Sequence, residues 1–79
     1  MGTIDAVIAT LNNLGVGPID KIEADLEGVR EELERRDLRE LVQGIDECRL
    51  ALSRGDLSEF RRVKERIVSR LGHLRFRMD

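Results

Sequence analysis

The sequence is poor in the residues on which most metal, disulfide and catalytic chemistry depends. It contains no tryptophan or tyrosine, one cysteine (Cys48), one histidine (His73) and one proline. One cysteine cannot close an intrachain disulfide, and one cysteine with one histidine falls short of the four ligands of a structural zinc site. No Glu-x-x-His pair is present for a di-iron bundle. We therefore expect no metal, no cofactor and no catalytic residues in this chain.

Long apolar runs and targeting signals are also missing. No stretch reaches the roughly 18 apolar residues that a membrane-spanning helix needs. The N-terminus lacks a positive region followed by an apolar run, which is the pattern of a secretory signal peptide. Met1-Gly2 suggests myristoylation, but Ala6 stands where that motif has serine or threonine. The sequence therefore predicts a soluble, cytoplasmic protein with no membrane partner.

Charged and apolar residues dominate the composition, and the apolar ones are regularly spaced. Charged residues make up 38% of the 79 residues and apolar residues 41%. Such a charged composition is compatible with disorder, but the apolar residues recur every three or four positions, as they do on one face of a helix. A domain of this size needs very regular helix packing, or association with another chain, to be stable.

The apolar spacing predicts four helices in a single domain that covers residues 1–79. Their approximate ranges are 3–14, 19–36, 38–54 and 57–77. The segment 15–18 (Gly-Val-Gly-Pro) separates the first two, because glycine suits the C-terminal cap of a helix and proline can begin one. Gly55 is well suited to the C-terminal cap of the third helix.

The boundary between the second and third helices carries no glycine or proline. Leu33 and Leu38 are five residues apart, which rotates the apolar stripe by ~140° on an α-helix. Asp37 and Glu40 have the spacing of a capping box, so we predict a tight turn near Arg36 and a new helix start. A single kinked helix over 19–53 is the alternative.

Polar residues with capping potential precede the other helices. Thr3 is expected to cap the first helix. Asp20 with Glu23, and Asp56 with Glu59, have the capping-box spacing at the starts of the second and fourth helices.

The predicted fold is all-α: a small antiparallel bundle of three long helices and a short N-terminal helix, with coiled-coil-like seams. The helices over 38–54 and 57–77 are joined by about two residues and should form an αα-hairpin. The helix over 19–36 is expected to lie in the groove of this hairpin, with the first helix folded across it. The alternating spacing of three and four favours crossing angles near +20°.

The last predicted helix combines a regular seam with most of the positive charge. The a and d positions of its seven-residue repeat are Leu57, Phe60, Lys64, Ile67, Leu71, Leu74 and Met78. Residues 54–79 carry eight Lys/Arg against four Asp/Glu, a net charge of +4, whereas residues 1–53 have a net charge of −6. Either the basic helix packs beside acidic helices, or it forms a surface for a polyanion.

Several single residues are expected to have structural rather than chemical roles. Cys48 lies on a seam position and should be a buried small apolar residue rather than a reactive thiol. His73 should face solvent, and the adjacent acids Glu31 and Glu32 should form a solvated face. Gly44 flanks the seam of the third helix, where it either permits a close approach of another backbone or is an indifferent choice.

The function we expect is that of a small non-enzymatic protein–protein interaction or assembly module, which acts through its helix faces and chiefly through the last helix. The partner is another protein or a second copy of the chain. The candidate partner-binding residues are Phe60, Arg61, Lys64, Leu71, Arg75, Phe76 and Met78. Phe76 and Met78 extend the apolar stripe past the expected end of the bundle. Nucleic-acid binding by the arginine-rich helix is the alternative, against which the pI of 5.4 and the scarcity of aromatic residues argue.

Two stretches resemble parts of helical enzymes and give a remote third alternative, a small enzyme. Arg66 and His73 have an R-x6-H spacing, which resembles the R-x4–6-H signature of HEPN-type helical ribonucleases, although those domains are longer than this chain. The other stretch resembles the first helix of the helical chorismate mutases and comprises Leu38, Arg39, Ile45, Asp46, Leu50, Leu52 and Arg54. In that family two further helices supply active-site groups, whereas only 25 residues follow Arg54 here.

Overall fold

Four helices make up the regular structure of the computed structural model, which describes residues 4–14 and 17–78 and, in α4, side chains as far as residue 74. Their bounds are α1 (Ile4–Asn12), α2 (Ile19–Arg35), α3 (Arg39–Ser53) and α4 (Leu57–Met78). Each coincides closely with a helix predicted from the apolar spacing. The prediction of an all-α antiparallel bundle with one short and three long helices is therefore confirmed.

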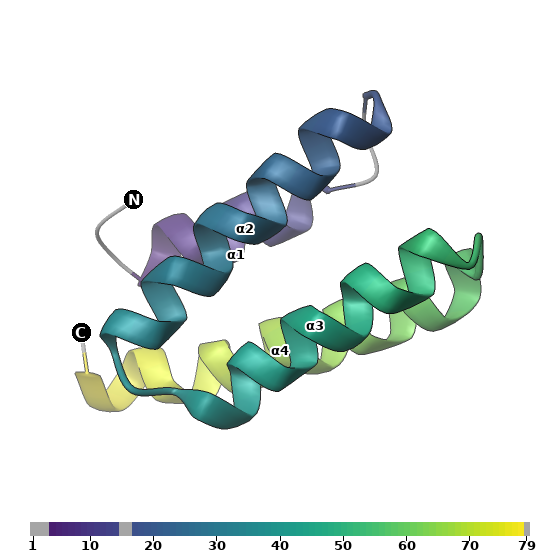
Figure 1. The fold of residues 1–79 in the computed structure, drawn as a ribbon. Coiled ribbons are helices and arrows are strands. Elements are labelled where there is room, and N and C mark those ends of the chain that lie inside the picture. The colour runs from purple at the N-terminus through teal and green to yellow at the C-terminus, as the bar shows by residue number, and fades with distance from the viewer. Residues whose placement is uncertain (1–3, 15–16, 79) are drawn as a thin grey trace.

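The helices are arranged as a ring in which each one packs on two others (Figure 1). The neighbouring pairs are α1–α2, α2–α3, α3–α4 and α4–α1. Successive helices run in opposite directions, so the first and last helices also lie antiparallel, and the beginning of α1 lies at the same end of the bundle as the end of α4. α1 thus occupies the fourth corner of the ring, whereas the sequence led us to expect it folded across a three-helix core. No helix of the described residues is long and apolar enough to cross a membrane.

The core is built from apolar residues that each helix contributes at intervals of three and four. Full burial of one such valine, leucine or isoleucine contributes about 1.5–3 kcal/mol to folding. The buried apolar residues are Ile4, Val7, Leu11, Leu14, Ile22, Leu26, Val29, Leu33, Leu41, Ile45, Cys48, Ala51, Phe60, Val63, Ile67 and Leu71.

The seam of α4 differs from the predicted one at its beginning. Leu57 was expected on the seam but is 60% exposed, whereas Val63 is 2% exposed and joins the core beside the half-buried Lys64. Leu57 is the first residue of α4, at the hairpin end of the α3–α4 pair, and most of its side chain is left uncovered there. A straight helix also has 3.6 residues per turn, and its buried stripe drifts away from a strict seven-residue pattern.

The α2–α3 connection is a tight turn, so the alternative of one kinked helix over 19–53 is wrong. The N–H of Leu38 donates to the carbonyl of Leu33 at 3.0 Å, and the N–H of Asp37 donates to the carbonyl of Glu34 at 3.0 Å. These two bonds form a Schellman motif, which normally places glycine in the left-handed conformation. Here Asp37 takes that position, with φ of 60°. Because Asp37 ends α2, it does not cap α3, and the predicted capping box with Glu40 is wrong; α3 begins after Leu38 without a side-chain cap.

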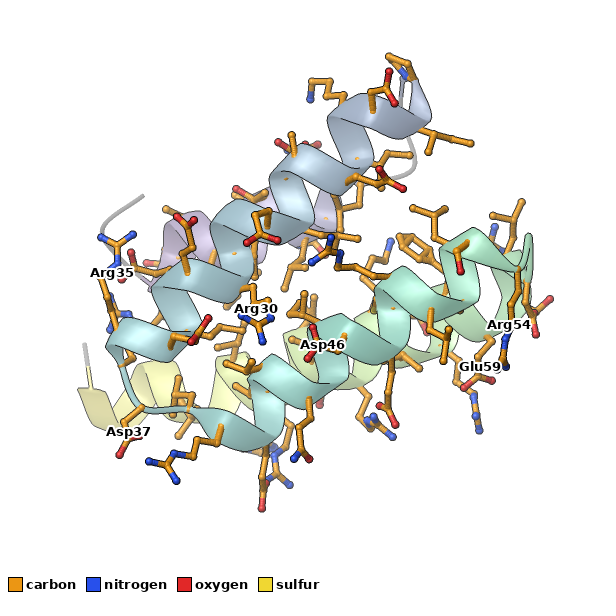
Figure 2. All side chains as sticks on the ribbon, in the orientation of Figure 1. Arg30, Arg35, Asp37, Asp46, Arg54 and Glu59 are labelled. Carbon is orange, nitrogen blue, oxygen red and sulfur yellow. The ribbon has the colours of Figure 1, made fainter. Side chains whose placement is uncertain are left out.

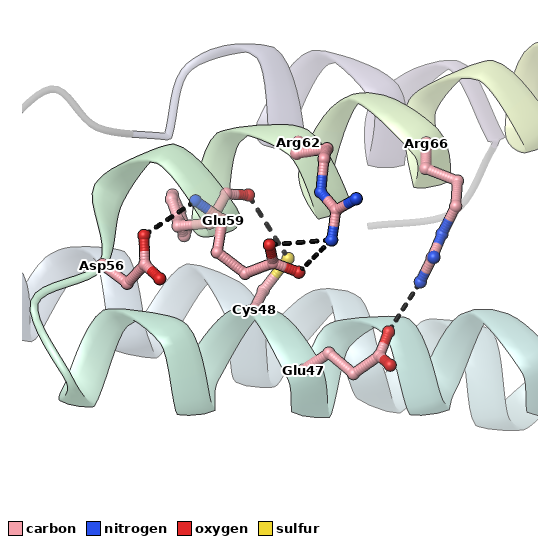
Figure 3. Close-up of polar contacts among 7 residues, drawn as sticks. Glu47, Cys48, Asp56, Glu59, Arg62 and Arg66 are labelled. Carbon is pink, nitrogen blue, oxygen red and sulfur yellow. Dashed lines mark hydrogen bonds and ion pairs between the residues drawn. The ribbon is translucent and has the colours of Figure 1, made fainter.

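The α3–α4 connection uses the same motif with glycine in the left-handed position. The N–H of Asp56 donates to the carbonyl of Ala51 at 2.9 Å, and Gly55 has φ of 74°. The Asp56 carboxylate then accepts the N–H of Glu59 at 3.1 Å (Figure 3), as predicted for the start of α4. The predicted box at Asp20 is wrong, because α2 begins one residue earlier, at Ile19, after Pro18 and without a side-chain cap. The predicted cap Thr3 lies outside the described residues.

Gly44 sets the separation of α3 and α4. It is buried, and a Cβ atom at this position would lie 2.9 Å from Cδ1 and 3.0 Å from Cγ1 of Ile67. A Cβ atom at Gly28 or Gly72 would meet nothing within 4 Å. Of the two interpretations of Gly44, the close approach of the neighbouring helix is therefore correct.

Glu32 is an unexpected part of the interior. It was predicted on a solvated face with Glu31, but Glu32 is only 6% exposed, whereas Glu31 is exposed. Its carboxylate accepts a hydrogen bond from Arg36 Nε at 3.1 Å, and Arg35 lies 3.8 Å away. The i,i+4 partner Arg36 therefore compensates the charge that α2 carries into the bundle.

Candidate functional site

Arginines of α4 are paired with acids within the chain. Arg66 donates to Glu47 of α3 at 2.6 Å, and Arg70 donates to Glu40 of α3 at 2.6 Å. Arg62 binds both carboxylate oxygens of Glu59, at 2.7 and 2.8 Å (Figure 3). These contacts match the first of our two interpretations of the charge asymmetry, in which the basic helix packs beside acidic ones.

The α2–α3 pair is bridged in the same way. Arg30 Nε donates to Asp46 at 2.9 Å, and the two side chains point toward one another across the helices (Figure 2). Arg49 donates to Glu27 at 2.8 Å. The hydrogen bond with Asp46 raises the pKa of Arg30, so this guanidinium stays charged. Such exposed pairs contribute little to the free energy of folding, but they favour the arrangement in which this face of α2 lies against α3.

An open groove lies where α3 begins and α4 ends. Its volume is about 590 Å³. Its apolar lining consists of the half-buried Leu38 and Leu74 with the buried Leu41. Its polar lining consists of Asp37, Arg39, Glu40, Arg70 and His73. We call these eight residues the terminal groove.

The terminal groove exists because α4 continues past the beginning of α3. Gly44 lies against Ile67, and Glu40 pairs with Arg70, so the first residue of α3 lies level with about residue 71 of α4. Residues 73–78 of α4 have no turn of α3 beside them. At 1.5 Å per residue this unflanked end is roughly 9 Å long. The yellow end of α4 accordingly reaches past the α2–α3 turn (Figure 1).

Two of the predicted partner-binding residues belong to the core. Phe60 is 6% exposed and Leu71 is fully buried. Both side chains pack in the core of the same chain, so their apolar character serves the fold. A direct contact of these two residues with a partner stays a prediction.

The remaining predicted residues keep their place as candidates. Arg61 is exposed and Lys64 half-buried, and neither forms an ion pair with another described side chain. Arg75, Phe76 and Met78 belong to the unflanked end of α4, and their side chains lie outside the described part of the structure. The partner-binding role of these five residues stays a prediction.

The only thiol is placed for packing rather than for reaction. Cys48 is fully buried, and its sulfur donates to the carbonyl of Phe60 at 3.9 Å (Figure 3). Burial, followed by the nearby Glu47 carboxylate, raises the pKa of Cys48 from 9.0 to about 11. The thiolate is thus disfavoured, as expected for an apolar seam residue.

The charged residues and the histidine behind the enzyme resemblances are distributed over the surface. Arg66 is engaged by Glu47, and His73 is exposed in the terminal groove. Arg39 and Asp46 are exposed on α3, each in an ion pair of its own. No group of three or more His, Cys, Asp or Glu in the described parts of the chain is arranged to hold a metal ion.

Sequence reasoning missed the terminal groove itself. Leu38 was interpreted as the apolar residue at which a new helix phase begins, Glu40 as part of a capping box, and Leu74 as a seam position of the last helix. A signal was nevertheless present. The predicted ranges 38–54 and 57–77 have unequal lengths, and a hairpin of unequal helices leaves the end of the longer one unflanked.

No known protein family, curated protein or solved structure matches this chain.

Proposed function

We propose that this protein is a non-enzymatic interaction module that binds a helix of a partner protein in the terminal groove. The supporting observation is the groove itself: a concave site with leucine on its floor, at the point where the longest helix runs past its neighbour. A partner helix laid there would occupy the position that α3 would fill if it were longer. Recognition of an amphipathic helix by an apolar groove is a common mode of protein association.

The lining of the groove has the composition of an interaction site. Leu38, Leu41 and Leu74 supply apolar area that a partner can cover. The Glu40–Arg70 pair and the Asp37–Arg39 pair stand at its rim and can orient the partner. Nucleic-acid binding has less support, because Arg62, Arg66 and Arg70 already bind carboxylates of the same chain.

Site-specific photo-cross-linking tests the proposal. A photoreactive amino acid replaces His73, which is exposed in the groove, or Leu50, which is 51% exposed near the far end of α3. We expect discrete protein adducts from position 73 and none, or only diffuse ones, from position 50. Equal adduct patterns at the two positions, or none at either, would refute an interaction at the groove. Adducts with nucleic acid would favour the alternative function.

A further inference from the structure

Two large apolar residues that the described structure leaves exposed lie beside charges of a single sign. Leu57, at the start of α4, is 60% exposed, and Ile19, at the start of α2, is 59% exposed. Single exposed apolar residues are normal on protein surfaces. These two are different because each belongs to a charged stripe on its helix, basic on α4 and acidic on α2.

The stripe on α4 consists of Leu57, Arg61 and Lys64, which we call the basic stripe. Spacings of four and three residues place them on one side of the helix. Arg66, which reaches α3, lies about 160° around the helix from Lys64, so the basic stripe is turned away from α3. Neither of its two cations forms an ion pair with another described side chain. The exposed Glu65 lies a further ~100° around, on the outer surface.

The neighbour of α4 on this side, α1, offers no acid to the basic stripe. Because α4 packs on α3 and on α1, the side turned away from α3 is the side of α1. The only charged residue among the first nineteen is Asp5, in the first turn of α1, which lies beside the end of α4 and not its start (Figure 1). On the α3 side, by contrast, Glu40 and Glu47 each pair with an arginine of α4. The basic stripe is thus left without a counter-charge in the described part of the chain.

The stripe on α2 consists of Ile19, Asp20 and Glu23, which we call the acidic stripe. All three residues are exposed, and neither acid forms an ion pair with another described side chain. Lys21 lies about 160° around the helix from Glu23, where it pairs with Asp25 at 3.3 Å. The acidic stripe therefore matches the basic stripe, with one exposed apolar residue and two charges of the opposite sign.

The ring arrangement keeps the two stripes apart within one copy. Both α2 and α4 pack on α1 and α3, so they stand at opposite corners of the ring. They run in the same direction, so both stripes lie at the end of the bundle where α2 and α4 begin (Figure 1). A chain therefore cannot neutralise its basic stripe with its own acidic stripe, whereas a second copy can. Because the two stripes differ, such a contact is head-to-tail.

We propose that the acidic stripe of one copy docks on the basic stripe of another, so that the start of α2 packs against the start of α4 and the chain associates with itself head-to-tail. Ile19 and Leu57 form the apolar centre of the contact, and the charges beside them steer and orient the two copies. The contact uses none of the residues that line the terminal groove, so it goes beyond the proposed function and is tested separately from it. Self-association also adds burial, which a domain of this size commonly needs.

Light scattering at low salt, over a wide range of protein concentrations, measures the association. We expect the average mass to rise with concentration above that of the 9.0 kDa chain, and to fall again when salt is added, because salt screens exposed charges. Ile19→Ser and Leu57→Ser should each weaken association by at least about tenfold, because residues at the centre of an interface carry most of its binding energy. Circular dichroism checks that each variant remains folded.

Charge reversal makes the test specific. The variant Arg61→Glu with Lys64→Glu carries two acidic stripes, and the variant Asp20→Lys with Glu23→Lys carries two basic ones. Neither variant should associate with itself, but a mixture of the two should associate with about the affinity of the natural chain, because each contact again joins opposite charges. Glu31→Lys reverses a charge at an exposed site of α2 outside the acidic stripe and should have no effect.

A chain that stays monomeric at every concentration would overturn the inference. Association that either double variant retains on its own would overturn it, and so would a mixture of the two variants that stays monomeric. A loss of association in Glu31→Lys as large as in the double variants would also overturn it, because association would then follow net charge and not the two stripes.

Discussion

Gly44 offers the sharpest test of how α3 and α4 pack. Alanine is preferred to glycine inside a helix by about 0.5–1 kcal/mol. Gly28→Ala and Gly72→Ala should therefore raise the free energy of unfolding by this amount, because a Cβ atom at either site meets nothing within 4 Å. At Gly44 the same change places a methyl group 2.9 Å from Cδ1 of Ile67. Overpacking of this kind costs about 1–3 kcal/mol, so we expect a net loss of roughly 1–2 kcal/mol.

Urea unfolding followed by far-UV circular dichroism measures these differences. Thermal midpoints should move by about 4–8 °C for each kcal/mol in a domain of this size. Ile67→Val removes the nearer of the two atoms and should cost less in the Gly44→Ala background than in the wild type, with a coupling of at least about 0.5 kcal/mol. If Gly44→Ala stabilised the protein as much as Gly28→Ala does, the close approach of the two helices would be refuted.

Three further predictions concern a turn, an ion pair and the thiol. Asp37→Gly should stabilise the protein by about 0.5–1 kcal/mol in urea unfolding, because Asp37 adopts φ of 60°, which glycine takes without strain; a loss of stability would contradict this account of the turn. Arg36→Ala should lower the free energy of unfolding by about 1–3 kcal/mol, because it leaves the buried Glu32 carboxylate without its 3.1 Å partner. Arg35→Ala, at an exposed site 3.8 Å from Glu32, should change that free energy by less than about 0.5 kcal/mol. Equal effects of the two changes would refute the distinction. The pKa of Cys48 is raised from 9.0 to about 11 in the folded state, so the unfolded chain loses this proton first. The free energy of unfolding should therefore fall by roughly 2 kcal/mol as the pH rises from about 9 to about 11. Cys48→Ala should lack this part of the pH dependence, and parallel curves would contradict the assignment.

The fold was predictable because its main determinants are local. Apolar residues at intervals of three and four gave four helices, and Gly17-Pro18 and Gly55 marked two of the three connections. The phase change between Leu33 and Leu38 marked the third. What it did not reveal was the role of Asp37, because one polar residue can either cap the next helix or end the previous one. Which role it takes depends on whether Leu38 is covered by the core, and that is a tertiary effect.

The site was less predictable because it depends on relative positions of whole helices. Phe60 and Leu71 are apolar residues in a basic helix, and their sequence context does not distinguish a core face from a partner face. Their burial follows from the ring arrangement, in which α1 packs against α4 as well as α2. The terminal groove depends on the register of α3 against α4, which Gly44 and the Glu40–Arg70 pair fix. The uneven distribution of charge along the chain was visible in the sequence, but the carboxylates that pair with the arginines of α4 were not.

Photo-cross-linking from several positions tests the central claim, an interaction at the terminal groove, most directly. A photoreactive amino acid is placed in turn at Arg39 and His73, which line the groove, and at the exposed Glu23 and Leu50, which lie away from it. The account predicts the same discrete protein adduct from positions 39 and 73, and this adduct from neither position 23 nor position 50. The adduct in equal yield from all four positions, or from positions 23 and 50 alone, would contradict it.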